Sequence, residues 1–178
     1  MRYLRLFAAF CALGGLASAP VAPGVSNFHQ VDDHVYRGAQ PPAAGFAHLA
    51  RIGIKTVVDL RDEPAQIRAE QHAVEAAGMR FVSIPMHGLT APMDQVIAQA
   101  LAILNDPAAA PVFVHCRRGA DRTGTVIACY RISFQHWRND KALAEARSLG
   151  MSWMERAMQH YVLAYHDRSL SSATAVEK

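Results

Sequence analysis

The sequence of 178 residues lacks paired cysteines and a strong excess of charge of one sign. Its three cysteines, Cys11, Cys116 and Cys129, are too few and too irregularly spaced for a disulfide framework or a zinc site. The formal net charge is only +3, so no strongly basic face indicates a nucleic-acid partner. HExxH, CxxC pairs and nucleotide-binding loops are also missing, and we therefore expect no metal and no other cofactor.

The composition that remains is that of a globular protein. Apolar residues make up 51% of the chain and charged residues 19%, which excludes a disordered or collagen-like protein. The length suits one domain of ordinary size. The sequence does not indicate an oligomeric state.

The first nineteen residues resemble a signal peptide. Arg2 and Arg5 precede an apolar run from Leu6 to Leu16, and Ala17-Ser18-Ala19 is a small-residue cleavage site. Pro20 follows that site, so cleavage one or two residues away is an alternative, and a buried N-terminal helix is another. Cleavage removes two basic residues and lowers the net charge to +1. No second run is long enough to span a membrane, so we expect an exported protein without a membrane span.

Strand and helix patterns alternate along the rest of the chain. We expect strands at 35–37, 56–60, 81–84 and 111–115, and helices at 43–52, 64–77, 124–135, 140–149 and 152–166. A further helix ends at Leu104 and is capped by Thr90 or Asp94. This order predicts an α/β fold with a largely parallel sheet of four to five strands flanked by helices. The expected domain covers 35–168, after an N-terminal extension (20–34) and before a C-terminal tail (169–178).

Chemistry-bearing residues concentrate in the loop after the strand at 111–115. It reads His115-Cys116-Arg117-Arg118-Gly119-Ala120-Asp121-Arg122-Thr123-Gly124 and leads into an apolar helix. Parallel sheets bind ligands at the carboxyl ends of their strands. Backbone N–H groups of such a loop, together with the N-terminus of the next helix, bind a small oxyanion. The sequence therefore predicts a phosphate-binding loop (P-loop) formed by Arg117, Arg118, Gly119, Ala120, Asp121 and Arg122.

Cys116 and Arg122 suit nucleophilic attack on phosphorus. The helix N-terminus and the arginines favour the thiolate of Cys116. Arg122 offers a planar guanidinium that binds two phosphate oxygens at once. Attack by the thiolate gives a phospho-cysteine, which water then hydrolyses.

The motif His-Cys-x5-Arg-Thr-Gly resembles the signature of the cysteine-dependent protein tyrosine phosphatases. The segments Val35–Pro41 (VYRGAQP) and Val57–Arg61 (VVDLR) are similar to further landmarks of the compact dual-specificity branch, closest to its small exported bacterial members. We call Cys116–Arg122 the signature loop. The resemblance implies the phosphatase fold and a periplasmic location.

The resemblance also implies individual roles. Cys116 would be the nucleophile and Arg122 the phosphate clamp. Thr123 would donate a hydrogen bond to the thiolate, and His115 would orient the signature loop through buried hydrogen bonds. Asp59 and Arg61 would form a buried polar scaffold below the site.

The general acid that protonates the leaving oxygen is less clearly marked. Related phosphatases carry it on a loop after the third strand. No acidic residue lies between Glu75 and Asp94, so Asp94 is the only upstream candidate, although it is closer to Cys116 in the sequence than the acid of the family usually is. Asp121 is a rival, because an Asp before the Arg serves as the acid in some lipid-directed and bacterial relatives. His87 is a third candidate. Asp94 as a helix cap and Asp121 as a partner of Arg118 are the structural alternatives.

The sequence thus predicts a phosphomonoester hydrolase acting on phosphotyrosine, extending to phosphoserine and phosphothreonine. Arg117 and Arg118 also suit a more highly charged substrate, so a phosphoinositide or inositol-polyphosphate phosphatase is the alternative. A phospho-binding module with little turnover is a further alternative. The sequence does not identify the physiological substrate.

Overall fold

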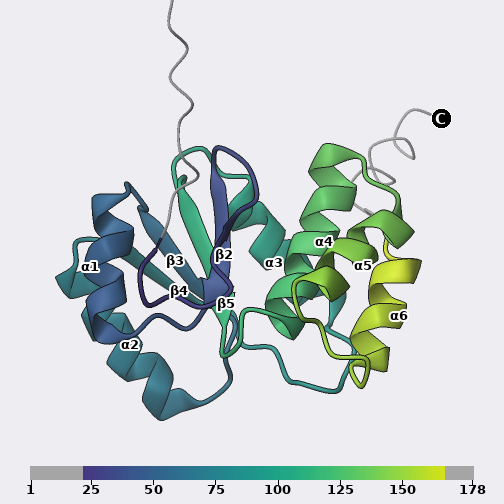
Figure 1. The fold of residues 1–178 in the computed structure, drawn as a ribbon, viewed down its shortest axis with the longest axis horizontal. Coiled ribbons are helices and arrows are strands. Elements are labelled where there is room, and N and C mark those ends of the chain that lie inside the picture. Colours follow the sequence, from purple (N-terminus) through teal and green to yellow (C-terminus); the bar gives the residue numbers. More distant parts are fainter. Residues whose placement is uncertain (1–21, 167–178) are drawn as a thin grey trace, which may run out of the picture.

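The computed structural model describes residues 22–166 (Figure 1). The predicted signal peptide at 1–19 and the predicted tail at 169–178 lie outside the described residues. None of the helices within 22–166 has the length and apolar character needed to cross a membrane.

A five-stranded sheet forms the centre of the described chain, with the order β1-β2-β5-β3-β4. The strands are β1 (His29–Gln30), β2 (Val35–Ala39), β3 (Thr56–Asp59), β4 (Arg80–Ser83) and β5 (Val112–Cys116). All neighbours are parallel except β1, which pairs antiparallel with β2. The expected α/β fold with a largely parallel sheet is confirmed.

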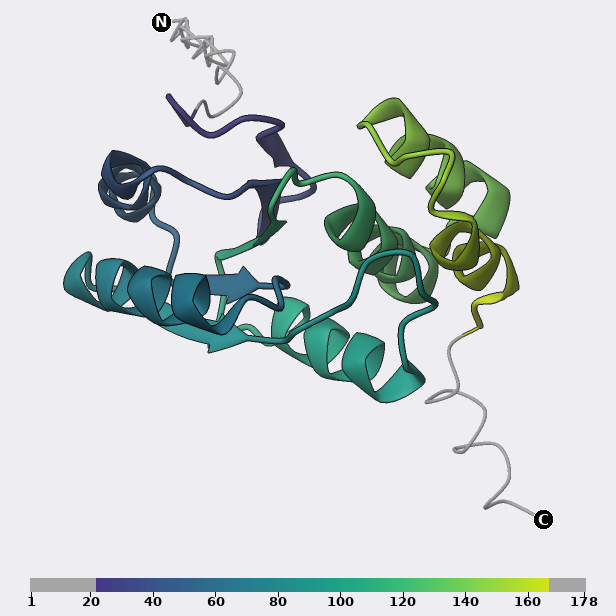
Figure 2. The same ribbon diagram turned by 90° about the horizontal axis from the view of Figure 1, so that it is seen from below.

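Within residues 22–166, six helices flank the sheet: α1 (Ala43–Arg51), α2 (Pro64–Ala76), α3 (Asp94–Leu104), α4 (Asp121–Gln135), α5 (Asn139–Ser148) and α6 (Arg156–Ala164). Helices α1 and α2 lie on one side of the sheet and α3 to α6 on the other (Figures 1 and 2). Side chains of β5 alternate between the two cores, as the strand period of two requires. Phe113 packs with α1 and α2, and Val112 and Val114 pack with α3 and α4.

Three elements differ from the sequence prediction in their presence or by more than two residues at one end, and one of them is α6, which begins at Arg156 rather than at Ser152. Strand β1 was not expected, because two exposed residues carry no hydrophobic pattern. Helix α4 begins at Asp121 rather than at Gly124, so Asp121, Arg122 and Thr123 form its first turn. Glycine at 124 suggested a later start, but in this helix Gly124 lies close to Met151 and Ala146, where a larger residue would crowd.

The segment predicted as an N-terminal extension takes part in the fold from Ala22 onward. Ala22 and Val25 are buried in the core beneath α1, and β1 extends the sheet beside β2. The N-terminal segment therefore covers one edge of the sheet.

The parallel pairing brings the last residues of three strands together at one end of the sheet. Ala39 lies opposite Cys116 and Asp59 opposite His115 in the strand register. The carboxyl ends of β2, β5 and β3 therefore surround the start of the signature loop.

Candidate active site

Cys116 is the last residue of β5 and is 2% exposed. The strand is buried along its full length, which fixes the thiol at the base of the signature loop. The chain then turns through Gly119 and enters α4 at Asp121. The positive end of a helix of 15 residues thus points at the same loop.

Gly119 allows an unusually close approach between the signature loop and β2. Its φ is +66°, and a Cβ at this position would lie 2.3 Å from the carbonyl carbon and oxygen of Gly38. A larger residue would therefore force the loop away from the sheet.

The carbonyl oxygen of Gly119 accepts two side-chain hydrogen bonds. Arg37 Nη2 donates to it at 2.6 Å, and Asn27 Nδ2 at 2.9 Å. A peptide unit is planar and its N–H points opposite to its C=O. Holding this oxygen on the Arg37 side therefore turns the N–H of Ala120 to the other side of the loop.

Arg37 is an unusual group to find in this position, since it is only 1% exposed. Its Nε and Nη1 atoms are buried without a hydrogen-bond partner among the described residues. Burial lowers the pKa of Arg37 to about 10, which still leaves it charged at neutral pH. The buried positive charge lies close enough to interact electrostatically with Cys116.

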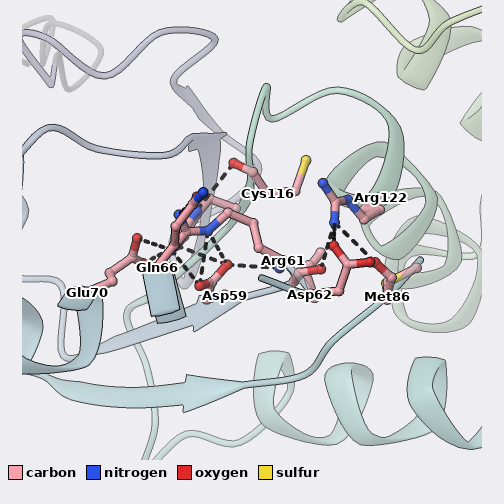
Figure 3. Close-up of polar contacts among 10 residues, drawn as sticks. Asp59, Arg61, Asp62, Gln66, Glu70, Met86, Cys116 and Arg122 are labelled. Atoms are coloured by element: carbon pink, nitrogen blue, oxygen red, sulfur yellow. Dashed lines mark hydrogen bonds and ion pairs between the residues drawn. The ribbon is translucent and has the colours of Figure 1, made fainter. Parts of the chain in front are cut away.

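Arg122 is held by three oxygens. Its Nη1 donates to Asp62 Oδ1 at 3.0 Å, to the Met86 carbonyl at 3.1 Å and, at 3.5 Å, to the Leu60 carbonyl. These contacts come from the segments that follow β3 and β4. Figure 3 shows the other end of the guanidinium turned toward the side on which the Cys116 sulfur lies. These three contacts hold one end of the Arg122 guanidinium, so the clamp predicted from the sequence has a defined orientation.

Asp62 links this clamp to His87, a connection that sequence reasoning missed. Asp62 Oδ2 lies 2.7 Å from His87 Nδ1, while the other oxygen contacts Arg122. Burial disfavours the charged carboxylate, but the hydrogen bond from His87 and the charge of Arg122 outweigh it and lower the pKa of Asp62. Asp62 is therefore ionised at neutral pH. No local motif marks Asp62, because its partners are 25 and 60 residues away.

A buried polar network lies below the signature loop (Figure 3). Arg61 Nη2 binds Asp59 Oδ2 at 2.7 Å and Glu70 Oε2 at 2.6 Å. Glu70 Oε1 in turn lies 2.6 Å from Nε2 of His115. Asp59 and Arg61 thus form the scaffold that the sequence suggested, and Glu70 from α2 joins it. Burial disfavours the Arg61 charge, but its bonds to Asp59 raise the pKa of Arg61.

Asp59, Glu70 and His115 also form a group of three potential metal ligands. Arg61 contacts both carboxylates of this group. A guanidinium between the two acids already neutralises charge that a cation would otherwise compensate. The donor set therefore fits an ion-paired network better than a metal site.

The residues predicted to support Cys116 differ in their contacts. His115 Nδ1 lies 3.3 Å from the Cys116 carbonyl, which is a buried hydrogen bond to the signature loop. The hydroxyl of Thr123 is buried and has no hydrogen-bond partner within residues 22–166. The predicted bond from Thr123 to the thiol is thus not made in this structure, and its role in the second step stays a prediction.

The two carboxylates proposed as general acids have separate partners. Asp121 accepts from Arg118 Nη2 at 2.6 Å and from the backbone N–H of Ser152 at 2.8 Å. Asp94 accepts a hydrogen bond from the Tyr161 hydroxyl of α6 at 2.9 Å. The cap predicted for α3 is not formed by Thr90 or Asp94, since Met93 occupies the N-cap position and Asp94 begins the helix.

Arg117 and Arg118 extend outward from the signature loop and are exposed. The hydrogen bond to Asp121 raises the pKa of Arg118. Cys129 lies two turns further along α4, fully buried, and burial raises the pKa of its thiol. Both Cys116 and Cys129 are free thiols in the part of the chain that the structure describes.

A buried thiol at the start of an anion-binding loop, with a guanidinium held beside it, defines a cysteine-dependent phosphatase. A family model described as "DSP-PTPase phosphatase fused to NAD+ Kinase" matches residues 20–163. The chain belongs to this family, the dual-specificity branch of the cysteine-dependent tyrosine phosphatases. It is a phosphoric monoester hydrolase of the protein tyrosine phosphatase type.

Individual relatives agree with this assignment. Inositol diphosphatase DSP2 of Oryza sativa subsp. japonica is 27% identical over 170 residues, which cover 89% of this chain and 78% of the relative. Dual specificity protein phosphatase TpbA of Pseudomonas aeruginosa (strain UCBPP-PA14) is 35% identical over 130 residues, which cover 70% of this chain and 55% of TpbA. The chain thus spans about half of that relative's length.

Solved structures show the same fold. The crystal structure of Pseudomonas aeruginosa TpbA in complex with phosphotyrosine aligns with a TM-score of 0.72 and 29% identity, covering 91% of this chain and 98% of that one. The catalytic core of the Saccharomyces cerevisiae phosphatase SIW14, in complex with citrate, aligns with a TM-score of 0.72 at 23% identity, covering 87% and 94%.

Proposed function

We propose that this protein is an exported protein-tyrosine phosphatase that works through a phospho-cysteine on Cys116. The observation that carries the proposal is the signature loop itself. The thiol of Cys116, the oriented peptide between Gly119 and Ala120, and Arg122 lie together at the carboxyl ends of three parallel strands. This arrangement suits the charge that develops on a phosphoryl group during transfer.

Two displacements at phosphorus complete the reaction. The Cys116 thiolate forms a sulfur–phosphorus bond while the bond to the ester oxygen breaks, and that oxygen leaves with a proton from the general acid. Water then attacks the phospho-cysteine and gives a proton to the same group, now a base, while the sulfur–phosphorus bond breaks and releases inorganic phosphate and the thiolate. Loop N–H groups and Arg122 stabilise the equatorial oxygens in both steps.

Phosphotyrosine is the proposed substrate because the TpbA structure with phosphotyrosine is similar over most of this chain. The alternative is an inositol polyphosphate or phosphoinositide. It is favoured by the relatives named inositol diphosphatases and by the exposed Arg117 and Arg118 at the signature loop. Dual specificity toward phosphoserine and phosphothreonine belongs to the same proposal.

Export to the periplasm is part of the proposal. It is supported by the pattern of two arginines, an apolar run and Ala17-Ser18-Ala19 at the start of the chain. Expression of the full chain in a Gram-negative host, followed by fractionation and N-terminal sequencing, tests it. A mature N-terminus close to residue 20 is expected, and a full-length cytosolic product would contradict it.

A panel of substrates tests the catalytic proposal. Phosphotyrosine, phosphoserine and phosphothreonine peptides, inositol polyphosphates and phosphoinositides are compared with the purified protein under reducing conditions. We expect the highest kcat/KM on phosphotyrosine. Cys116→Ser should abolish turnover and retain binding of phosphate, since the loop N–H groups and Arg122 remain. Residual turnover by Cys116→Ser would contradict the phospho-cysteine, and a preference for inositol polyphosphates would favour the alternative.

A further inference from the structure

Exposed apolar side chains concentrate on two loops. Leu89 and Met93 lie between β4 and α3, and Trp153 and Met154 lie between α5 and α6. Their exposed fractions are 65%, 68%, 75% and 59%. Scattered apolar residues on a surface are ordinary, but four large ones on two short segments indicate a binding surface. We call these four residues the apolar rim.

The two loops are joined to each other. The backbone N–H of Leu89 donates to Glu155 Oε2 at 2.8 Å, and Glu155 is itself buried. Both ribbon views show the loops side by side, at the end of the molecule where β5 runs into α4 (Figures 1 and 2). The two loops that carry the apolar rim are therefore neighbours, and a hydrogen bond holds them together.

The loop between α5 and α6 also packs directly on the signature loop and the start of α4. The N–H of Ser152 donates to Asp121 Oδ1, one residue before the phosphate clamp. A Cβ on Gly150 would lie 3.7 Å from the Cβ of Ala120, and Met151 Cε would lie 3.2 Å from a Cβ on Gly124. Trp153 and Met154 follow these contacts immediately. The loop that carries Trp153 and Met154 is thus packed against the signature loop and the first turn of α4.

We propose that the apolar rim binds apolar side chains next to the phosphotyrosine of a protein substrate. The proposal rests on the proposed tyrosine phosphatase function and names the class of protein it acts on. Apolar side chains of a peptide would remove the indole of Trp153 and the thioether of Met154 from water, which is favourable. Inositol polyphosphates present only hydroxyl and phosphate groups and gain nothing from such a surface.

Two phosphotyrosine peptides of equal length and charge test the proposal, one with leucine and phenylalanine beside the phosphotyrosine and the other with glycine at those positions. The wild type should prefer the apolar peptide by about tenfold in kcat/KM, because part of an aromatic surface leaves water. The difference should appear in KM. In the double variant Trp153→Ser with Met154→Ser, the ratio between the two peptides should fall toward one.

Leu163→Ser is the matched control, since Leu163 is exposed near the end of α6 and outside the apolar rim. It should keep the wild-type ratio. If the ratio of kcat/KM between the two peptides is the same in the wild type and in the double variant, the apolar rim does not bind apolar side chains of the substrate. If neither peptide is hydrolysed, the proposed function itself fails.

A second copy of the chain and a lipid surface are the two alternative ligands of the apolar rim, and the same variants distinguish them from a peptide. Size-exclusion chromatography reports a second copy of the chain, and sedimentation with phosphatidylglycerol vesicles reports a lipid surface. A double variant that loses self-association or vesicle binding, while it keeps the peptide ratio, would assign the apolar rim to that occupant and overturn the proposal.

Discussion

The Gly119 carbonyl is the residue-scale feature with the clearest mechanistic consequence. Arg37 and Asn27 both donate to it, so the peptide unit between Gly119 and Ala120 has one defined orientation. Oxyanion binding by backbone groups depends on such pre-set orientation, because no energy is then needed to turn the N–H when phosphate arrives.

Asn27→Ala should therefore weaken oxyanion binding, and it should also lower the thermal midpoint, because the bond to Leu149 is lost and residue 27 has a φ of +52°. One hydrogen bond contributes about 0.5–1.5 kcal/mol, so we expect phosphate affinity and kcat/KM to fall by about two- to tenfold. Calorimetry with inorganic phosphate and the thermal midpoint measure the two effects separately. Asp33→Ala, an exposed change in the neighbouring turn, is the control. Unchanged phosphate affinity in Asn27→Ala would show that Arg37 alone fixes the peptide.

The choice among Asp94, Asp121 and His87 as the general acid stays a prediction, and it too concerns single residues. His87 is joined to the clamp Arg122 through one carboxylate, Asp62. Asp121 is occupied by Arg118 and Ser152, and Asp94 interacts with Tyr161. Because the pKa of Asp62 is lowered, Asp62 is itself a poor proton donor.

We therefore expect His87→Gln to slow phosphotyrosine hydrolysis by about 10²–10⁴-fold and to affect aryl phosphates with an acidic phenol much less. The basic limb of its pH–rate profile should flatten. Asp94→Asn should cost stability of about 0.3–1 kcal/mol, through the dipole of α3. If Asp94→Asn or Asp121→Asn shows the leaving-group dependence instead, that carboxylate is the acid.

At the scale of elements, α2 contributes an unexpected group to the site. Most of this helix is exposed, and its buried residues are Glu70 and Val74. Glu70 binds Arg61 and lies against His115, which contacts the Cys116 carbonyl. The helix therefore supports the signature loop through a buried carboxylate as well as through apolar packing.

Glu70→Gln should destabilise the fold strongly, because it removes one charge from a buried ion-paired network. Breaking such a pair typically costs about 3–5 kcal/mol. Urea unfolding followed by circular dichroism measures the change. Glu75→Gln, at an exposed site of the same helix, should stay within about 0.5 kcal/mol of the wild type. Equal stability of both variants would mean that Glu70 is dispensable to the network.

The elements themselves could largely be predicted from the sequence. The apolar strands β3 and β5 and the helices with clear stops at Gly53 and Gly78 follow local patterns. Asp62 and Glu70 could not be predicted, because their roles depend on partners brought close only by the parallel sheet. The motif around Cys116 was readable because the nucleophile and the clamp are neighbours in the sequence.

At the scale of the whole molecule, the two described thiols should respond differently to oxidation. Cys129 is fully buried and burial raises the pKa of its thiol, so it stays protonated and unreactive. Cys116 is also nearly buried, at 2% exposed, but it lies beside the positive charge of Arg37 and the N-terminus of α4, which makes it the more reactive thiol. Mild peroxide should therefore oxidise Cys116 and inactivate the enzyme, and a thiol reductant should restore the activity. Peptide mass spectrometry locates the modification. A disulfide between Cys116 and Cys129 as the main product would contradict this expectation.

The N-terminal segment makes the catalytic unit longer than its recognisable motifs. Asn27 Nδ2 donates to the carbonyls of Gly119 and Leu149, so it ties the signature loop to the end of α5. Exopeptidase trimming that stops before Ala22 would leave this tie intact. Trimming that reaches Gln30 would remove both the tie and the edge strand β1, and would impair an enzyme whose nucleophile, clamp and acid candidates were all still present.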